Sequence, residues 1–181
     1  MPTLTVTRVA SPVGELLLGA SERGVCLLEF ANPDRRSREI AELEGAFDAT
    51  FEEGTNRHLE QLAYELDGYF AGRVRSFSVA LDTPGTAWQR RVWDALVTIP
   101  CGETSSYGAL AEKLGSPGAA RAVGLANGQN RVAIVVACHR VIGAGGALVG
   151  YGGGVERKRW LLDHEAAMTG SGTLFTPAGS S

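Results

Sequence analysis

The sequence predicts an α/β N-terminal half, residues 1–83, followed by a mainly helical C-terminal half, residues 84–166. Three observations support this division. Short runs rich in Val, Thr and Leu alternate with Ser, Pro and Gly turns over the first thirty residues, which is typical of strands. Apolar residues recur at helical spacing from position 58 onward. After a turn at residues 82–85, most of the remaining pattern is helical.

The N-terminal half is expected to contain four strands and two helices. The strands are predicted at residues 4–9, 15–19, 24–30 and 77–81, and the helices near residues 35–43 and from 58 to a cap at Gly72. Cys26 lies in the third strand and is interpreted as a core residue, because free cysteine is among the most buried residue types.

The C-terminal half begins with a helix that Thr86 can cap and Pro100 ends. A second helix is predicted from Ser105 or Ser106 to Gly115, and a third from Gly118 to about Ala126. The apolar residues 132–137 are expected to form a strand, and residues 141–148 a strand and a turn. In a last helix, residues 155–165, some side chains should point inward (Val155, Trp160, Leu161, Leu162) and others outward (Glu156, Arg157, Lys158, Arg159).

Composition narrows the class of protein. The chain of 181 residues has no apolar run near the ~20 residues that cross a bilayer, and its start resembles no signal peptide. Three widely separated cysteines fit a reducing compartment. We therefore expect a cytoplasmic protein, nucleoid-associated if the source is bacterial, without a membrane anchor. No histidine or cysteine spacing indicates a metal site. Residues 167–181, rich in Gly, Ser, Thr and Ala, are predicted to be a flexible tail.

The net charge of −3 is unevenly distributed. Residues 1–83 carry 8 Lys and Arg against 14 Asp and Glu, whereas residues 84–181 carry 9 against 6. The small basic excess suggests that only the second half faces a polyanion.

Chemistry concentrates at Cys138, His139 and Arg140, which follow the apolar run directly. A thiol becomes a good nucleophile as thiolate, and a neighbouring imidazole and positive charge promote that form. The alternative is a small core residue at the end of a strand. The tripeptide alone leaves both interpretations open.

The second and third C-terminal helices, joined by a short Gly-Pro turn, have the outline of a helix-turn-helix. The third helix is almost bare of large side chains, with Arg121 as its one long cation. Small residues permit close backbone approach to another surface. The alternative is a tight helix–helix contact with a solvated Arg121.

A series of motifs in order over residues 85–165 resembles the O6-alkylguanine-DNA alkyltransferases. The strongest are Arg121-Ala-Val-Gly-x-Ala-Asn127-Gly-x-Asn130, Cys138-His-Arg-Val-Ile142 and Gly150-Tyr151-x-Gly-Gly154. Trp88-Gln89-x-x-Val92-Trp93 and Ile99-Pro100-x-Gly-x-Thr-x-Ser-Tyr107 precede them, and Trp160-Leu-Leu-x-x-Glu165 follows. In the first half, Ser11-Pro12-x-Gly14 and Tyr69-Phe70-x-Gly72 are similar more loosely. The resemblance implies a ribonuclease-H-like sheet domain followed by a helical domain with a helix-turn-helix.

The resemblance also implies a function. It is irreversible, stoichiometric transfer of an alkyl group from O6 of guanine in double-stranded DNA to Cys138, with O4 of thymine as a second candidate substrate. A bare helix would enter the minor groove, Arg121 would fill the gap left by a flipped nucleotide, and Tyr107 would assist its rotation. The helix residues expected at the DNA are Ala119, Ala120, Ala122 and Gly124. No cofactor is implied, and a monomer is expected.

By the same resemblance, Glu165 would orient His139, and a water would connect His139 to Cys138. Asn130 would hold the segment before the nucleophile. The guanine pocket would be lined by Tyr107, Val141, Tyr151 and Gly152, and Arg140 is expected to support the domain interface by an ion pair.

Two residues depart from the family pattern, which usually has proline before the cysteine and after the asparagine. Here Ala137 and Arg131 stand in those places, so the pocket rim should be less preorganised.

Two other functions compete with alkyl transfer. A sensor or regulator of alkylated DNA would bind without transfer, although such regulators usually read bases with larger side chains. A Cys-His hydrolase would need an oxyanion hole.

Overall fold

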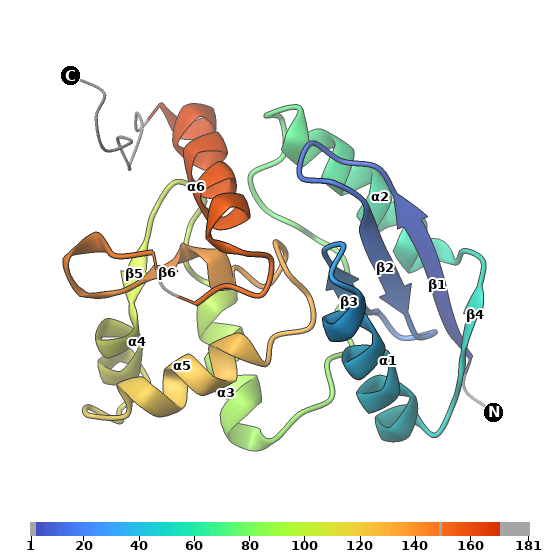
Figure 1. The fold of residues 1–181 in the computed structure, drawn as a ribbon, viewed down its shortest axis with the longest axis horizontal. Coiled ribbons are helices and arrows are strands. Elements are labelled where there is room, and N and C mark those ends of the chain that lie inside the picture. The colour runs from blue at the N-terminus through green and yellow to red at the C-terminus, as the bar shows by residue number, and fades with distance from the viewer. Residues whose placement is uncertain (1–2, 149, 171–181) are drawn as a thin grey trace.

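The computed structural model describes residues 3–148 and 150–170. Figure 1 shows a sheet domain and a helical domain side by side. The sheet has the order β3-β2-β1-β4. Strands β1 (Leu4–Val9), β2 (Leu16–Ala20) and β3 (Val25–Glu29) form an antiparallel meander, and β4 (Phe51–Glu53) pairs in parallel with β1.

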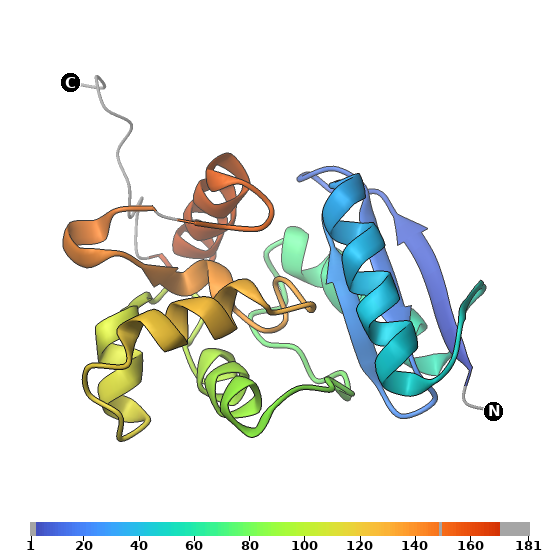
Figure 2. The same cartoon turned by 60° about the horizontal axis from the view of Figure 1, so that its bottom comes forward.

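Helices α1 (Pro33–Phe47) and α2 (Arg57–Phe70) cover opposite faces of this sheet (Figure 2). Because successive strand residues point to opposite faces, neighbouring leucines of β2 belong to different cores. Leu16 and Leu18 pack in the cluster that includes Leu62 of α2, while Leu17 packs in the cluster that includes Leu43 of α1. The predicted α/β half is therefore confirmed, with a longer first helix than expected.

The helical domain contains α3 (Ala87–Val97), α4 (Tyr107–Lys113), α5 (Ala120–Gly128) and α6 (Val155–Thr169). A short parallel pair, β5 (Ser105–Ser106) and β6 (Val141–Ile142), lies among them, with 3-10 turns η1 (Cys138–Arg140) and η2 (Ala144–Gly146). Thr86 caps α3 in a reciprocal capping box with Gln89, as the sequence predicted.

The segment before Cys138 attaches to the edge of the N-terminal sheet. Leu28 of β3 donates from its N–H to the Arg131 carbonyl at 2.9 Å and accepts from the Ala133 N–H at 3.0 Å. Apolar residues of both domains also share one buried cluster. The N-terminal domain therefore contacts and supports the loop that carries Cys138.

Two predicted strands are wrong. Residues 132–137 form turns in which only Val132 bridges to β3. Ile134 has φ 69°, a left-handed conformation that interrupts a strand and is strained for a β-branched residue. Residues 77–81 reach the sheet only at the isolated bridge between Val25 and Leu81. The apolar character of both segments reflects burial against other elements, which periodicity alone does not distinguish from pairing.

The third and last C-terminal helices also differ from expectation. Helix α5 continues through Asn127 to Gly128, and α6 continues to Thr169, past the predicted start of the tail. Residues 171–181 of that tail lie outside the described residues. Val155 is 40% exposed and not inward, whereas Lys158, expected outward, is fully buried. Among the described residues, no helix is both long and apolar enough to cross a membrane.

Candidate active site

Asn130 organises the loop that carries Cys138. Its side-chain carbonyl accepts from the Val132 N–H at 2.9 Å, and its amide donates to the Val136 carbonyl at 2.9 Å. The same amide lies 3.1 Å from Cys138 Sγ and donates to it. The buried Asn130 side chain thus closes the loop and holds the sulfur of Cys138, the first residue of η1.

Burial keeps Cys138 in its thiol form. The sulfur-bearing residue is only 6% exposed, and burial raises the pKa of the thiol to about 11. The Asn130 hydrogen bond and the charges of Arg35 and Lys158 oppose this shift, while Glu29 adds to it. The thiol therefore needs a base before it can act as a nucleophile at neutral pH.

A buried polar cluster lies directly behind Cys138. His139 Nε2 is 2.6 Å from Glu165 Oε1, and both residues are fully buried. Arg140 contacts both carboxylate oxygens, through Nε at 2.9 Å and Nη2 at 2.8 Å. The Tyr69 hydroxyl, from the N-terminal domain, donates to Glu165 at 2.9 Å.

These contacts set the protonation of the cluster. Burial alone would raise the pKa of Glu165, but His139 and Arg140 hold it well below its usual range. Burial outweighs Glu165 and lowers the pKa of His139. Arg140 therefore neutralises an ionised Glu165, while His139 stays neutral and donates from Nε2. A neutral imidazole that donates from Nε2 has a basic Nδ1.

His139 Nδ1 is buried and has no hydrogen-bond partner among the described residues. No direct hydrogen bond joins His139 to Cys138 in that part of the chain. The side chain expected to serve as a base therefore presents an open acceptor beside the nucleophile, and its link to sulfur requires an intermediary.

The space at Cys138 is narrow. A cavity of about 20 Å³ is bounded by Cys138, Asn130, Tyr151 and Gly152. A Cβ on Gly152 would lie 2.5 Å from the Arg35 guanidinium carbon, so this loop position favours glycine. The Tyr151 hydroxyl is buried without a partner among the described residues, and burial raises its pKa well above the usual value.

A larger cavity, about 440 Å³, lies on the far side of Arg140 and is lined by Phe77, Ile99, Cys101 and Ile134 among others. Neither Cys138 nor His139 lines it. This cavity is therefore separate from the thiol and imidazole that the sequence singled out.

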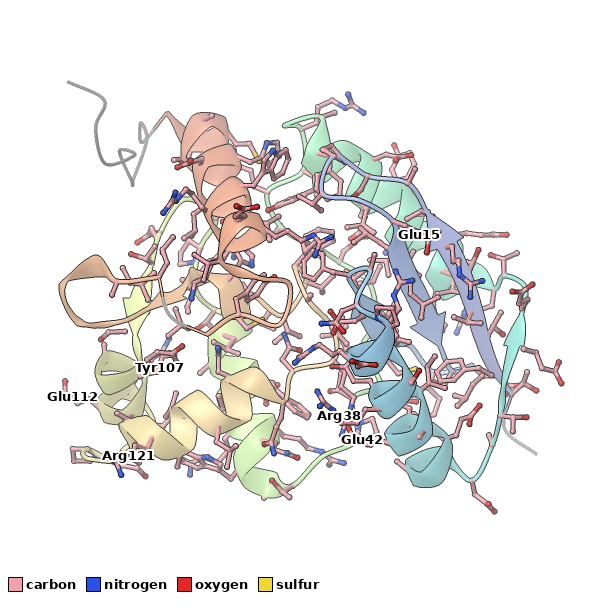
Figure 3. The ribbon with its side chains drawn as sticks, in the orientation of Figure 1. Glu15, Arg38, Glu42, Tyr107, Glu112 and Arg121 are labelled. Carbon is pink, nitrogen blue, oxygen red and sulfur yellow. The ribbon has the colours of Figure 1, made fainter. Side chains whose placement is uncertain are left out.

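Helix α5 presents small side chains and Arg121 to the surface. Ala119 and Ala120 are half-buried, Ala122 and Arg121 are exposed, and Leu125 is 66% exposed. Figure 3 places Arg121 at the start of α5 and Tyr107 at the start of α4, within the same domain. A Cβ on Gly124 would lie 3.7 Å from the Tyr107 ring, so these two helices meet closely.

Tyr107 lies close enough to Cys138 for the two side chains to interact electrostatically. Its side chain is half-buried, and burial followed by the charge of Cys138 raises its pKa. The structure thus brings Cys138, His139, Glu165 and Asn130 together, with Tyr107 and Tyr151 nearby. The Val141 side chain is fully buried, and its carbonyl accepts from Lys158 Nζ at 2.5 Å.

Sequence reasoning missed the contributions of Lys158, Tyr69 and Arg35 to the site. Lys158 Nζ lies 6.0 Å from the Tyr151 ring centre, and its charge lowers the pKa of Cys138. The Tyr69-Phe70-x-Gly72 motif could have drawn attention to Tyr69. The expected ion pair of Arg140 is present, but it is made with Glu165 inside the helical domain and not across the interface. The described residues contain no group of three or more His, Cys, Asp or Glu placed to hold a metal.

Comparison with known proteins identifies both domains. Residues 87–167 match the family model for the 6-O-methylguanine DNA methyltransferase DNA binding domain, and residues 4–83 match that for its ribonuclease-like domain. A Mycobacterium tuberculosis (strain H37Rv) methylated-DNA–protein-cysteine methyltransferase is 63% identical over 101 residues, 56% of this chain and 61% of the relative. Its Mycobacterium leprae namesake is 46% identical over 157 residues, 86% of this chain and 88% of the relative.

A solved structure extends the similarity to nearly the whole fold. The crystal structure of Mycobacterium tuberculosis OGT in complex with DNA aligns with a TM-score of 0.75 and 44% identity. The alignment covers 92% of this chain and 94% of that one. With matches to both domain models and to relatives over most of the chain, this protein belongs to the 6-O-methylguanine DNA methyltransferase family.

Proposed function

We propose that this protein repairs DNA by moving an alkyl group from O6 of guanine to Cys138 Sγ. The observation that carries the proposal is the thiol held 3.1 Å from the Asn130 amide beside the buried His139–Glu165 pair. Sulfur attacks the alkyl carbon in line, a C–S bond forms, and the C–O bond breaks. The electron pair returns to guanine, which takes up a proton from water. The thioether cannot be hydrolysed readily, so each molecule reacts once.

The proton of Cys138 leaves through a water to His139 Nδ1. Support for this path comes from the unpartnered Nδ1, the raised pKa of the thiol and the ionised Glu165 that stabilises an imidazolium. Asn130 then donates to the forming thiolate and removes some of the cost of its charge.

DNA reaches the site through α5 in the minor groove. Small residues at positions 119, 120, 122 and 124 let the helix approach the groove floor, where a large side chain would clash. Arg121 takes the place of the flipped nucleotide in the stack, and Tyr107 assists its rotation. Flipping is required because O6 of a stacked guanine is not open to in-line attack.

The guanine pocket opens when the base arrives. A space of about 20 Å³ holds roughly one water and no purine, so the loop around Tyr151 and Gly152 moves aside. Tyr151 then meets the base, and its buried hydroxyl gains a partner. O4-alkylthymine, with a smaller ring, is a second candidate substrate, and the protein acts as a monomer.

Intact-mass measurement after incubation with duplex containing O6-methylguanine tests the proposal. We expect one methyl adduct per molecule, located on the Cys138 peptide, and none for Cys138→Ser. Cys101→Ser, which removes a half-buried thiol outside the site, is the matched control and should react like wild type. Tight binding to the lesion with the methyl group still on guanine would instead identify a damage sensor.

A further inference from the structure

Arg131 occupies a position next to the loop-closing Asn130, and its side chain reaches three separate parts of the molecule. Its Nε pairs with Glu42 of α1 at 3.1 Å. Its Nη1 donates to the carbonyl of Pro84, in the segment between the two domains, at 3.0 Å. Its guanidinium carbon lies 6.0 Å from the Trp93 ring centre on α3.

These contacts are made where the domain interface is otherwise hollow. A polar cavity of about 290 Å³ opens between α1 and the end of α5, bounded by Arg38, Glu42, Gln129 and Arg131. Figure 3 shows Arg38 and Glu42 on the side of α1 that faces the helical domain. The Arg131 side chain is 15% exposed, so its contacts are partly shielded from water.

A second arginine holds the other side of the same residue. Arg35 Nη2 donates to the Gly128 carbonyl at 3.0 Å and to the Asn130 carbonyl at 3.2 Å. Side chains of the N-terminal domain thus contact the chain on both sides of Asn130, through Arg35 and Glu42. The Asn130 amide in turn contacts Cys138 Sγ. A shift of this segment would move the sulfur.

Among the described residues, no backbone hydrogen bond would be lost if proline, which has no N–H, replaced Arg131. Within the described residues, the Arg131 N–H donates no hydrogen bond, and only its carbonyl is used, by Leu28. A proline ring at this position would restrict the chain by fixing φ, whereas Arg131 restricts it through side-chain contacts. The two residues offer different means of holding the same loop.

We infer that Arg131 is a positioning residue for alkyl transfer: its contacts with Glu42, Pro84 and Trp93 hold the Asn130–Cys138 loop in the geometry that a proline ring would otherwise impose. The inference rests on the proposed function. It assigns to the N-terminal domain a part in placing the sulfur, without contact to the substrate.

Single-turnover methyl transfer from duplex O6-methylguanine tests it with Arg131→Ala and Arg131→Pro. Both variants lose the guanidinium, but only the second regains a restriction on the backbone. Arg131→Ala should slow transfer by about tenfold, less than the roughly hundredfold cost of a 1 Å displacement of reacting groups. Arg131→Pro should remain within about threefold of wild type, since its ring restores backbone restriction.

Glu42→Gln supplies an independent test of the same inference. It should slow transfer by about twofold in wild type, as suits a partly exposed ion pair, and have no effect in the Arg131→Pro background. Glu60→Gln makes the same charge change at an exposed position of α2. It is the control and should have no effect in either background.

Equal rates for Arg131→Ala and Arg131→Pro, whether unchanged or equally slowed, would overturn the inference, as would a slower proline variant. Thermal melts confirm that each variant is folded at the assay temperature. Iodoacetamide labelling of the Cys138 peptide separates this inference from the function on which it rests. A wild type that takes no methyl group refutes the function, while faster labelling of Arg131→Ala than of Arg131→Pro still reports a loosened loop.

Discussion

At the scale of single residues, the reactivity of Cys138 is decided by its neighbours and not by the thiol alone. A thiol with a pKa of about 11 has roughly one part in ten thousand as thiolate at pH 7. In the proposed mechanism, the Asn130 amide stabilises that thiolate, and His139 is the base that forms it. The adjacency of Cys138 and His139 in sequence is therefore less informative than the partner of His139, which is Glu165.

Replacement of His139 should expose the intrinsic pKa of Cys138. In wild type, the lowered pKa of His139 keeps the imidazole neutral, so transfer should be nearly flat from pH 8 to 6.5 and fall at lower pH. In His139→Gln, ionisation is unassisted, and the rate should drop about 10²–10⁴-fold at pH 7. It should then rise about tenfold per pH unit toward pH 10, since only the thiolate reacts.

Single-turnover rates between pH 6 and 10 would measure both profiles. His58→Gln, which changes a histidine of the N-terminal domain, is the control and should keep the wild-type profile. A flat profile for His139→Gln would show that His139 is not the base.

Ala137 allows a second experiment at residue scale. Its φ of −79° lies within the range of proline, and its N–H donates no hydrogen bond among the described residues. Ala137→Pro should therefore raise the free energy of unfolding by about 0.4–1 kcal/mol, chiefly by restricting the unfolded chain. Urea unfolding followed by tryptophan fluorescence measures this change. A loss of more than about 1 kcal/mol would mean that the buried site cannot hold the ring.

At the scale of elements, α1 and β3 meet through a buried group of charges. Arg35 Nε lies 2.8 Å from Glu29 and 3.0 Å from Glu39, and both carboxyl groups are almost fully buried. Burial and the neighbouring Glu29 raise the pKa of Glu39 to about 9. Glu39 is therefore neutral in the folded protein at pH 7 and does not balance the charge of Arg35.

Glu39→Gln should stabilise the protein at alkaline pH. The folded pKa of Glu39 lies above its unfolded value of 4.5, so the unfolded chain releases the proton first. The contribution of Glu39 to the free energy of unfolding must then fall as pH rises from about 4.5 to 9. Glutamine cannot ionise, so the variant should exceed wild type by about 1–3 kcal/mol at pH 8 and equal it at pH 4. Urea unfolding at both pH values measures the difference, and a variant less stable at pH 8 would contradict it.

The accuracy of sequence reasoning also depends on scale. Local signals located the strands of the meander, the Thr86-capped helix and the motif residues around Cys138, because each depends on nearby residues. The same signals gave the wrong interpretation of Lys158, whose acceptor is the carbonyl of Val141 in a distant segment. They also could not pair Tyr69 with Glu165, which lies 96 positions away.

At the scale of the whole molecule, the proposed function places alkyl transfer and the DNA surface in the helical domain, while side chains of the sheet domain hold the thiol site. Tyr69 completes the Glu165 cluster, and Arg35 holds the carbonyls beside Asn130. The sheet domain is acidic, with 14 Asp and Glu against 8 Lys and Arg, so it should repel a polyanion and leave the basic domain to face it. This separation means that delivery of the base and transfer of the alkyl group can be tested apart.

Arg121→Ala should separate the two steps. Arg121 lies on the exposed face of α5 and makes no hydrogen bond or ion pair within the described residues, so its loss should leave the thiol cluster intact. Transfer from duplex O6-methylguanine should slow by about 10–100-fold, since flipping costs a few kcal/mol and Arg121 offsets part of it. Transfer from the free base O6-benzylguanine should stay within about twofold, because no duplex has to open. Arg57→Ala removes the same charge from an exposed position of α2 and should change the transfer rate from neither substrate. Equal slowing of both substrates by Arg121→Ala would instead place the arginine in the chemistry of the pocket, and unchanged rates on both would remove it from delivery.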